Sequence, residues 1–135
     1  MKLILGAIAI ATSLAAVNGA NASCLQGYMF GVWSAYAVGL NFSGPFSVRC
    51  TLTLDQSGKV IPAYSACIQS GGQNAGATGN ITLISSGMCA FNGVIYTGGS
   101  TAEITQATLT ENGQVAIGVG TLSHGAFAFS MAKVH

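Results

Sequence analysis

"FSVRCTLTL", residues 46–54, is the stretch of the sequence that decides the fold. Apolar side chains occupy every second position, and serine, arginine and threonine lie between them. Because successive side chains of a β-strand point to opposite faces, this alternation predicts a strand with one buried face. The buried face is expected to hold Phe46, Val48, Cys50, Leu52 and Leu54.

Turn-forming residues divide the rest of the chain into further short strands. Asn-Gly pairs and glycine-containing clusters between apolar runs are typical of tight turns. Such turns are expected at 55–58, Asn92-Gly93, Asn112-Gly113 and 123–125. Strands are expected over about 32–38 and 59–67, from about Gly79, and after residue 125. The segment 69–79, "QSGGQNAGATG", is expected to be a flexible loop.

This pattern predicts an all-β fold, a single small antiparallel up-and-down barrel or sandwich of about seven or eight strands. The sequence of the last two expected strands predicts one face of large apolar residues and an opposite face of small residues. The apolar face is expected to be core and to hold Val115, Ile117 and Val119 with Phe127, Phe129 and Met131. The opposite, smooth face would hold Ala116, Gly118 and Gly120 with Ala128, Ser130 and Ala132.

The N-terminus has the pattern of an export signal. Lys2 precedes an apolar run, and Ala20-Asn21-Ala22 is the small-x-small pattern of a cleavage site. We therefore expect residues 1–22 to be a signal peptide and 23–135 to be a secreted domain, either periplasmic or extracellular. The apolar run is shorter than the ~20 residues that span a bilayer, so no membrane span is expected in the mature chain.

Charge is sparse: the 135 residues include only four Lys or Arg and three Asp or Glu. Without a basic stripe, nucleic acid is not expected as a partner. Near-zero net charge favours self-association, which leaves a structural or adhesive surface protein as an alternative function.

All four cysteines lie after the predicted signal, at Cys24, Cys50, Cys67 and Cys89. Their gaps are long and include no Cys-x-x-Cys pair, so no metal site is expected. An even number in an oxidising compartment predicts two disulfides, with three possible pairings. Cys24–Cys50 with Cys67–Cys89 is favoured, because the second bridge would close the glycine-rich loop at 69–79.

Catalytic motifs are missing from the sequence. Only His124 and the terminal His135 could serve a serine relay, and the few carboxylates lie apart or in turn sequences. General acid–base catalysis requires tunable groups that this chain hardly has. We therefore expect a protein that is not an enzyme and uses no cofactor.

Gly31-Val32-Trp33 falls in the first predicted strand and resembles the Gly-x-Trp of lipocalins and avidins, the calycin-type barrels. The tail "GTLSHGAFAFSMAKV" is similar in layout to the last hairpin of avidins. The resemblance implies that Trp33 closes one end of the barrel, with Lys133 over its ring in a cation–π contact. It also implies small-molecule binding. Biotin binding is not carried over, because Trp33 is the only tryptophan.

The first functional hypothesis is therefore a non-enzymatic exported barrel that binds a small apolar ligand. Its aromatic residues are expected to line or cap the mouth: Tyr28, Phe30, Trp33, Tyr36, Phe42 and Phe46. Of these, Trp33, Tyr36, Tyr28 and Phe30 are the candidate ligand-binding residues. Complete filling of the interior by side chains is the competing interpretation. Besides self-association, the other alternative is a partner-binding or inhibitor module that presents loop 69–79.

Overall fold

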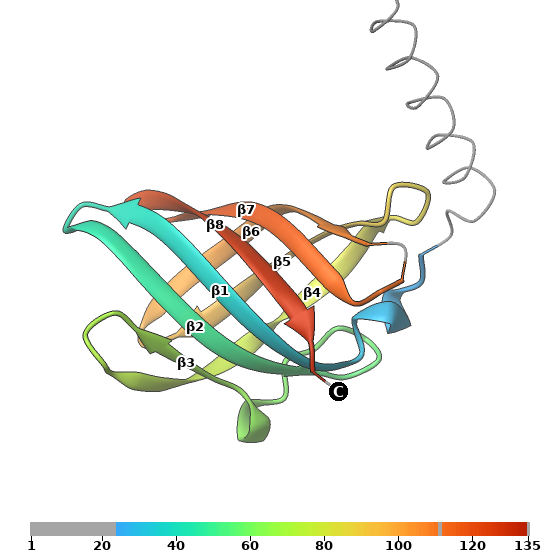
Figure 1. Cartoon of the computed structure of the whole chain (residues 1–135), viewed down its shortest axis with the longest axis horizontal. Coiled ribbons are helices and arrows are strands. Elements are labelled where there is room, and N and C mark those ends of the chain that lie inside the picture. Colours follow the sequence, from blue (N-terminus) through green and yellow to red (C-terminus); the bar gives the residue numbers. More distant parts are fainter. Residues whose placement is uncertain (1–23, 111, 135) are drawn as a thin grey trace, which may run out of the picture.

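The computed structural model describes residues 24–110 and 112–134, in which eight antiparallel strands form a closed barrel (Figure 1). The strands are β1 (Gly31–Asn41), β2 (Gly44–Leu54), β3 (Ala66–Gln69), β4 (Asn74–Ser85), β5 (Ala90–Thr97), β6 (Ser100–Leu109), β7 (Val115–Leu122) and β8 (Gly125–Lys133). Of two 3-10 helices, η1 (Gln26–Met29) precedes β1, and η2 (Pro62–Tyr64) lies between β2 and β3. Each strand pairs with the next in sequence, and β8 pairs with β1. The predicted up-and-down barrel is confirmed, and the sandwich is excluded.

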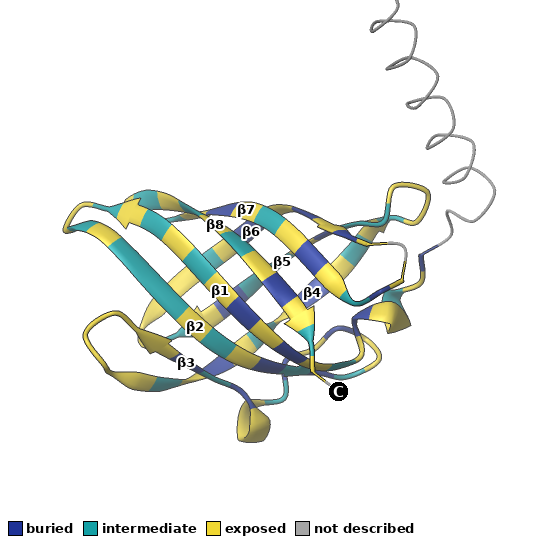
Figure 2. Ribbon diagram, in the orientation of Figure 1, coloured by how far each residue is buried: buried dark blue, intermediate teal, exposed yellow. Residues whose placement is uncertain are grey.

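The alternation in residues 46–54 has the predicted effect. Leu52 and Leu54 are buried in the interior, whereas Arg49 and Thr51, on the opposite face of the strand, are exposed. Buried and exposed positions alternate along several strands in the same way (Figure 2). The predicted signal peptide, residues 1–22, lies outside the described residues. Among those described, no helix is both long and apolar enough to cross a membrane.

Three of the four predicted turns are confirmed, and the one at Asn92-Gly93 is wrong. Those two residues lie inside β5, and the turn to β6 is at 98–99. Gly93 instead serves a close approach between strands, since a Cβ there would lie 2.2 Å from the carbonyl oxygen of Asn80 on β4. A glycine in a strand has this alternative use, which local sequence does not distinguish from a turn.

The predicted strand at 59–67 and the predicted loop at 69–79 are both largely wrong. Pro62 starts η2, so β3 has only four residues, and β4 already begins at Asn74. Where β3 does not reach along β4, the turn after β2 pairs with β4 directly. The backbone N–H of Ile81 donates to the backbone oxygen of Gly58 (2.8 Å), and that of Val60 donates to the backbone oxygen of Gly79 (2.9 Å). The barrel wall between β2 and β4 is thus β3 in one half and residues 58–60 in the other.

The faces predicted for the last hairpin are wrong for β7. Gly118 pairs with Phe129 and Gly120 with Phe127, and such directly opposite residues share a face. A Cβ would lie 2.7 Å from the Phe129 ring at Gly118 and 2.4 Å from the Phe127 ring at Gly120. The glycines therefore face inward and make room for the two rings. Three larger residues of β7 face outward and are exposed, namely Val115, Ile117 and Val119.

Asp55 organises the turn after β2. Its Oδ1 accepts hydrogen bonds from the backbone N–H of Ser57 (2.9 Å), the Ser57 hydroxyl (2.6 Å) and the backbone N–H of Lys59 (3.0 Å). The hydroxyl hydrogen bond is the largest cause that lowers the pKa of Asp55 from its ordinary value of 3.8. Stability from this carboxylate is therefore present above its unfolded pKa and lost as the pH falls through its lower folded pKa.

We expect Asp55→Asn to remove this part of the acid sensitivity. The stability difference between wild type and Asp55→Asn should be constant near neutral pH and should shrink below about pH 4. Melting temperatures of both proteins between about pH 2 and pH 7 measure it. Ser57→Ala, which removes the main donor, should move the decline to higher pH. A difference that is independent of pH would contradict the assignment.

Candidate ligand-binding cavity

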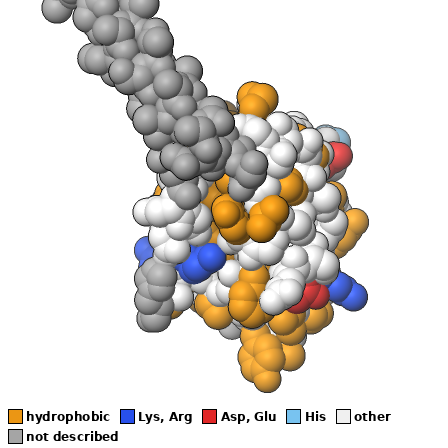
Figure 3. Space-filling model, turned by 90° about the vertical axis from the view of Figure 1, so that its right-hand side faces the viewer, with side chains coloured by type: hydrophobic (Ala, Val, Ile, Leu, Met, Phe, Trp, Pro, Cys, Tyr) orange, Lys and Arg blue, Asp and Glu red, His pale blue; other side chains and the backbone are white. Residues whose placement is uncertain are grey.

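Large side chains fill the barrel end that carries η1 and the C-terminus, at the right of Figure 1. Trp33 is fully buried there, and its indole Nε1 donates to the backbone oxygen of Met29 (2.9 Å), which is itself buried. Further large, fully buried side chains of the core are Phe91, Leu54, Ile81 and Val60. Figure 3 looks onto this end, where hydrophobic side chains appear on the surface in several separate groups.

Lys133 lies over the Trp33 ring, with its Nζ 5.2 Å from the ring centre. The same Nζ donates to the backbone oxygen of Tyr28 (3.0 Å), so the lysine also holds η1 against the barrel. The predicted cation–π contact at the closed end is therefore confirmed.

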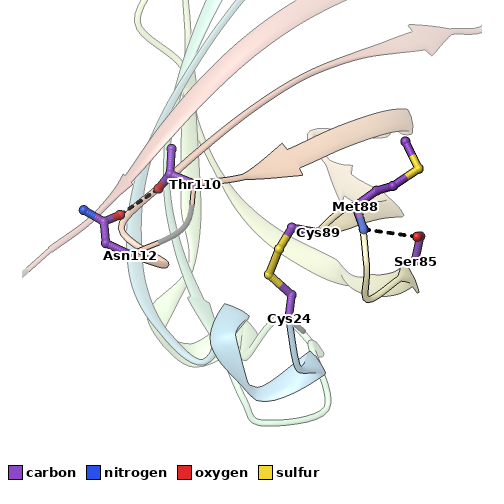
Figure 4. The surroundings of a disulfide bond; sticks show 6 residues. All are labelled: Cys24, Ser85, Met88, Cys89, Thr110 and Asn112. Carbon is purple, nitrogen blue, oxygen red and sulfur yellow. Dashed lines mark hydrogen bonds between the residues drawn. A yellow bond between two sulfur atoms is a disulfide. The ribbon is translucent and has the colours of Figure 1, made fainter. Parts of the chain in front are cut away.

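A disulfide and a glutamine fix the segment around η1 across this end. Cys24 is bonded to Cys89 in the β4–β5 turn, and its backbone N–H donates to Ser86 (3.1 Å) (Figure 4). Gln26 binds the backbone of β4 twice, because its Nε2 donates to Ile81 (2.9 Å) and its Oε1 accepts from Leu83 (2.6 Å). This end is closed by covalent and hydrogen-bonded attachment as well as by packing.

Two disulfides are present as predicted, but the favoured pairing is wrong. Cys50 bonds to Cys67, its direct neighbour in the β2–β3 register, with a Cα–Cα distance of 4.0 Å. Cys24 bonds to Cys89 because η1 carries the N-terminal segment toward the β4–β5 turn. The pairing follows from strand register and chain path, which gaps between cysteines do not reveal.

Towards the other end the interior side chains are small, and a cavity of about 300 Å³ remains. Ala37 on β1, Ala75 on β4 and Ala102 on β6 line it, where larger residues would fill the space. Its larger apolar lining residues are Phe46, Val48, Leu52, Ile95, Ile104, Leu122, Phe127, Phe129 and Met131. The interior is therefore not completely filled, and its volume is at the lower end of the ~300–1,000 Å³ of small-molecule sites.

The rim of this cavity is polar but uncharged. It is formed where strands meet their turns, by Asn41, Gln69, Gln73, Asn74, Thr97 and Ser100. A second hollow adjoins the cavity and shares Asn41, Ser100 and Leu122 with its lining. Phe42 and His124 line that hollow, with their rings edge to face at 5.4 Å between centres.

None of the four candidate ligand-binding residues lines the cavity. Trp33 lies in the closed end, and Tyr28 and Phe30 lie on or next to η1, partly exposed. Tyr36 is on the outer face of β1, with the Arg49 guanidinium 6.0 Å from its ring centre. Of the wider aromatic set, Phe46 lines the cavity and Phe42 lies beyond its rim.

The prediction of ligand-binding residues relied on aromatic type and on clustering in the sequence. In the structure, the strand face on which a residue lies decides whether it lines the cavity. The signal that identifies the lining was present in the alternation of residues 46–54, which places Phe46 and Val48 inside. It was also present in the prediction that Phe127, Phe129 and Met131 share an inward face.

The lining can form apolar contacts and hydrogen bonds. Its side chains carry amides, hydroxyls and hydrocarbon, and both of its cysteines, Cys50 and Cys67, are joined in a disulfide. Within residues 24–110 and 112–134, no group of three or more His, Cys, Asp or Glu is placed to hold a metal ion. The arrangement suits binding of a small molecule.

Comparison with known proteins gives matches in structure only. Neither the protein-family models nor the curated proteins with which the chain was compared give a match. A de novo designed fluorescence-activating β-barrel superposes with a TM-score of 0.59 at 13% identity, covering 79% of this chain and 94% of its own. The barrel EF1p2_mFAP2b, bound to DFHBI, gives 0.62 at 9% identity and covers 82% of this chain and 100% of its own.

A third solved structure, the redesigned barrel mFAP0 bound to DFHBI, gives a TM-score of 0.57 at 13% identity, covering 78% of this chain and 99% of its own. At these identities the matches show a shared fold. They name no lipocalin or avidin, so kinship with those families stays a prediction. The chain is therefore a small closed antiparallel β-barrel, similar in fold to designed barrels of which two are bound to a small molecule.

Proposed function

We propose that this protein binds a small apolar ligand inside the barrel, admitted through the end opposite η1, and that it does so without catalysing a reaction. The observation that carries the proposal is the cavity of about 300 Å³, lined mainly by hydrocarbon, in a barrel that is closed at one end. The two similar barrels bound to DFHBI support it, because they have the same fold.

The non-enzymatic part of the proposal rests on the lining itself. Catalytic acids and bases must be within hydrogen-bond reach of the reacting group. The cavity lining contains no Asp, Glu, His, Lys or Arg, and its cysteines are not thiols. Two disulfides are compatible with an oxidising compartment, and we propose that the protein is exported to the periplasm or beyond.

The proposal is tested by filling the cavity. Ala37→Phe places an aromatic ring in the cavity from β1, and we expect it to abolish binding of a neutral apolar dye, N-phenyl-1-naphthylamine. Because space is already present, the overpacking cost should be below the usual ~1–3 kcal/mol and the barrel should stay folded. Dye fluorescence titration measures binding, and thermal unfolding measures folding.

Val38→Phe is the matched control, since Val38 is the next residue on β1 and is exposed on the outer face. It should leave dye binding unchanged. Equal binding by wild type and a folded Ala37→Phe would mean that the dye binds elsewhere and would overturn the proposal. Native mass spectrometry of protein purified from its source tests for a retained natural ligand.

Self-association stays a prediction. Its structural counterpart is an exposed apolar outer face across β7, β8 and β1, which includes Ile117, Val119, Val38 and Leu40. Light scattering over a range of concentrations tests it, and a strictly monomeric protein would exclude it. The partner-binding alternative also stays a prediction, although only residues 70–73 of segment 69–79 are a loop.

A further inference from the structure

We propose that the ligand is an uncharged molecule with an apolar body and one hydrogen-bonding end, such as an alcohol or a primary amide. In this arrangement the apolar body lies between β1, β2, β6 and β8, and the polar end lies at the rim beside Gln69 and Gln73. The inference rests on the proposed binding function and narrows it to a class of ligand.

The lining includes no side chain that is charged at neutral pH. An ion transferred into such a site loses its hydration and gains no counter-charge, at a cost far larger than that of a hydrogen-bonded neutral group. A carboxylate or ammonium group is therefore disfavoured inside the cavity. Glu103 and His124 line the adjoining hollow, outside the cavity lining.

The polar side of the rim lies at the turn between β3 and β4. Gln69 ends β3 and Asn74 begins β4, and the backbone N–H of Gln69 donates to the backbone oxygen of Gln73 (3.3 Å). The short β3–β4 turn thus brings the carboxamides of Gln69 and Gln73 to one side of the mouth, whereas Asn74 is paired with Ile68, which is exposed on the outer face. Among the described residues, these two side chains accept or donate no hydrogen bond to the protein, in contrast to Asn41, whose Oδ1 accepts from Ser43 (2.8 Å).

The uncharged cavity and the carboxamides at its rim together suit one class of ligand. A carboxamide offers both donors and an acceptor, and so pairs with a hydroxyl or an amide without a change of protonation. An apolar ligand with such an end satisfies its polar group at the rim and keeps its hydrocarbon inside. A ligand without a polar end gains no hydrogen bond from these exposed amides, and is therefore expected to bind less tightly than a ligand that has such an end.

The test is displacement of N-phenyl-1-naphthylamine from the whole folded protein by decanol, decanamide, decanoate and decylammonium at neutral pH. We expect the alcohol and the amide to displace the dye at concentrations at least ~10-fold lower than the two ions, a difference of ~1.4 kcal/mol. Acidification that protonates decanoate should bring it close to the alcohol. Equal displacement by acid and alcohol at neutral pH would overturn the inference.

Variants of the rim locate the polar end. Gln73→Lys introduces a cation at the mouth and should improve decanoate displacement by about 10-fold. Thr78→Lys, exposed further along β4, makes the same charge change away from the mouth and should not. Gln69→Leu with Gln73→Leu should weaken displacement by the alcohol and the amide several-fold relative to the dye, whose affinity for this variant is titrated directly. If neither the dye nor any of the four compounds binds, the proposed function fails; if the dye binds but these preferences are missing, only this inference fails.

Discussion

Replacing Trp33 by alanine is expected to lower the free energy of unfolding by about 3–5 kcal/mol, the usual range for a fully buried aromatic side chain. Trp33 is the largest fully buried side chain, so its loss leaves a void in the closed end. It also removes the hydrogen bond to Met29 and the ring beneath Lys133, two contacts that hold η1 and the end of β8. Urea denaturation monitored by circular dichroism measures the change.

Tyr36→Ala is the matched control, because Tyr36 lies on the same strand with its side chain 46% exposed. It should cost less than about 1 kcal/mol, since Tyr36 is nearly half exposed on the outer face and its contact with Arg49 is long. Trp33→Phe separates volume from polar contacts and should fall between the two. Similar losses for Trp33→Ala and Tyr36→Ala would show that the closed end does not depend on this residue.

Replacing Cys24 and Cys89 together by alanine is expected to cost about 4 kcal/mol, because the bridge closes a loop with a sequence separation of 65 residues. Cys50 and Cys67 close a shorter loop, with a separation of 17, and their removal should cost about 3 kcal/mol. Both values follow from the entropy that a cross-link removes from the unfolded chain. Denaturant titrations of the two double variants compare them directly.

The two disulfides should also differ in what their loss does to binding. Cys50 and Cys67 line the cavity and join the shortest strand, β3, to β2. Their removal should weaken dye binding in protein that is still folded, whereas removal of Cys24–Cys89 should affect stability and leave the cavity intact. Wild-type protein with four free thiols would contradict the assignment of both bridges.

The sequence alone determined the strand period and an all-β fold of about seven or eight strands, and the structure then decided for the barrel over the sandwich. Alternation in residues 46–54 is a local property of the chain, and it identified correctly which side chains of β2 point inward. The contact between Trp33 and Lys133 at the closed end was also predicted correctly, from a resemblance in the first and last strands, whereas Trp33 does not line the cavity. The presence of two disulfides followed from cysteine number and compartment.

Tertiary structure alone decided the pairing of the cysteines, the inward face of β7 and the existence of the cavity. Gly118 and Gly120 face inward because the rings of Phe129 and Phe127 occupy the space opposite them, and that space is known only once the register is fixed. The cavity exists because small residues far apart in sequence, among them Ala37, Ala75 and Ala102, all line the same part of the interior. The unfilled volume of the interior depends on the combined size of side chains from different strands. No local sequence pattern gives that combined size.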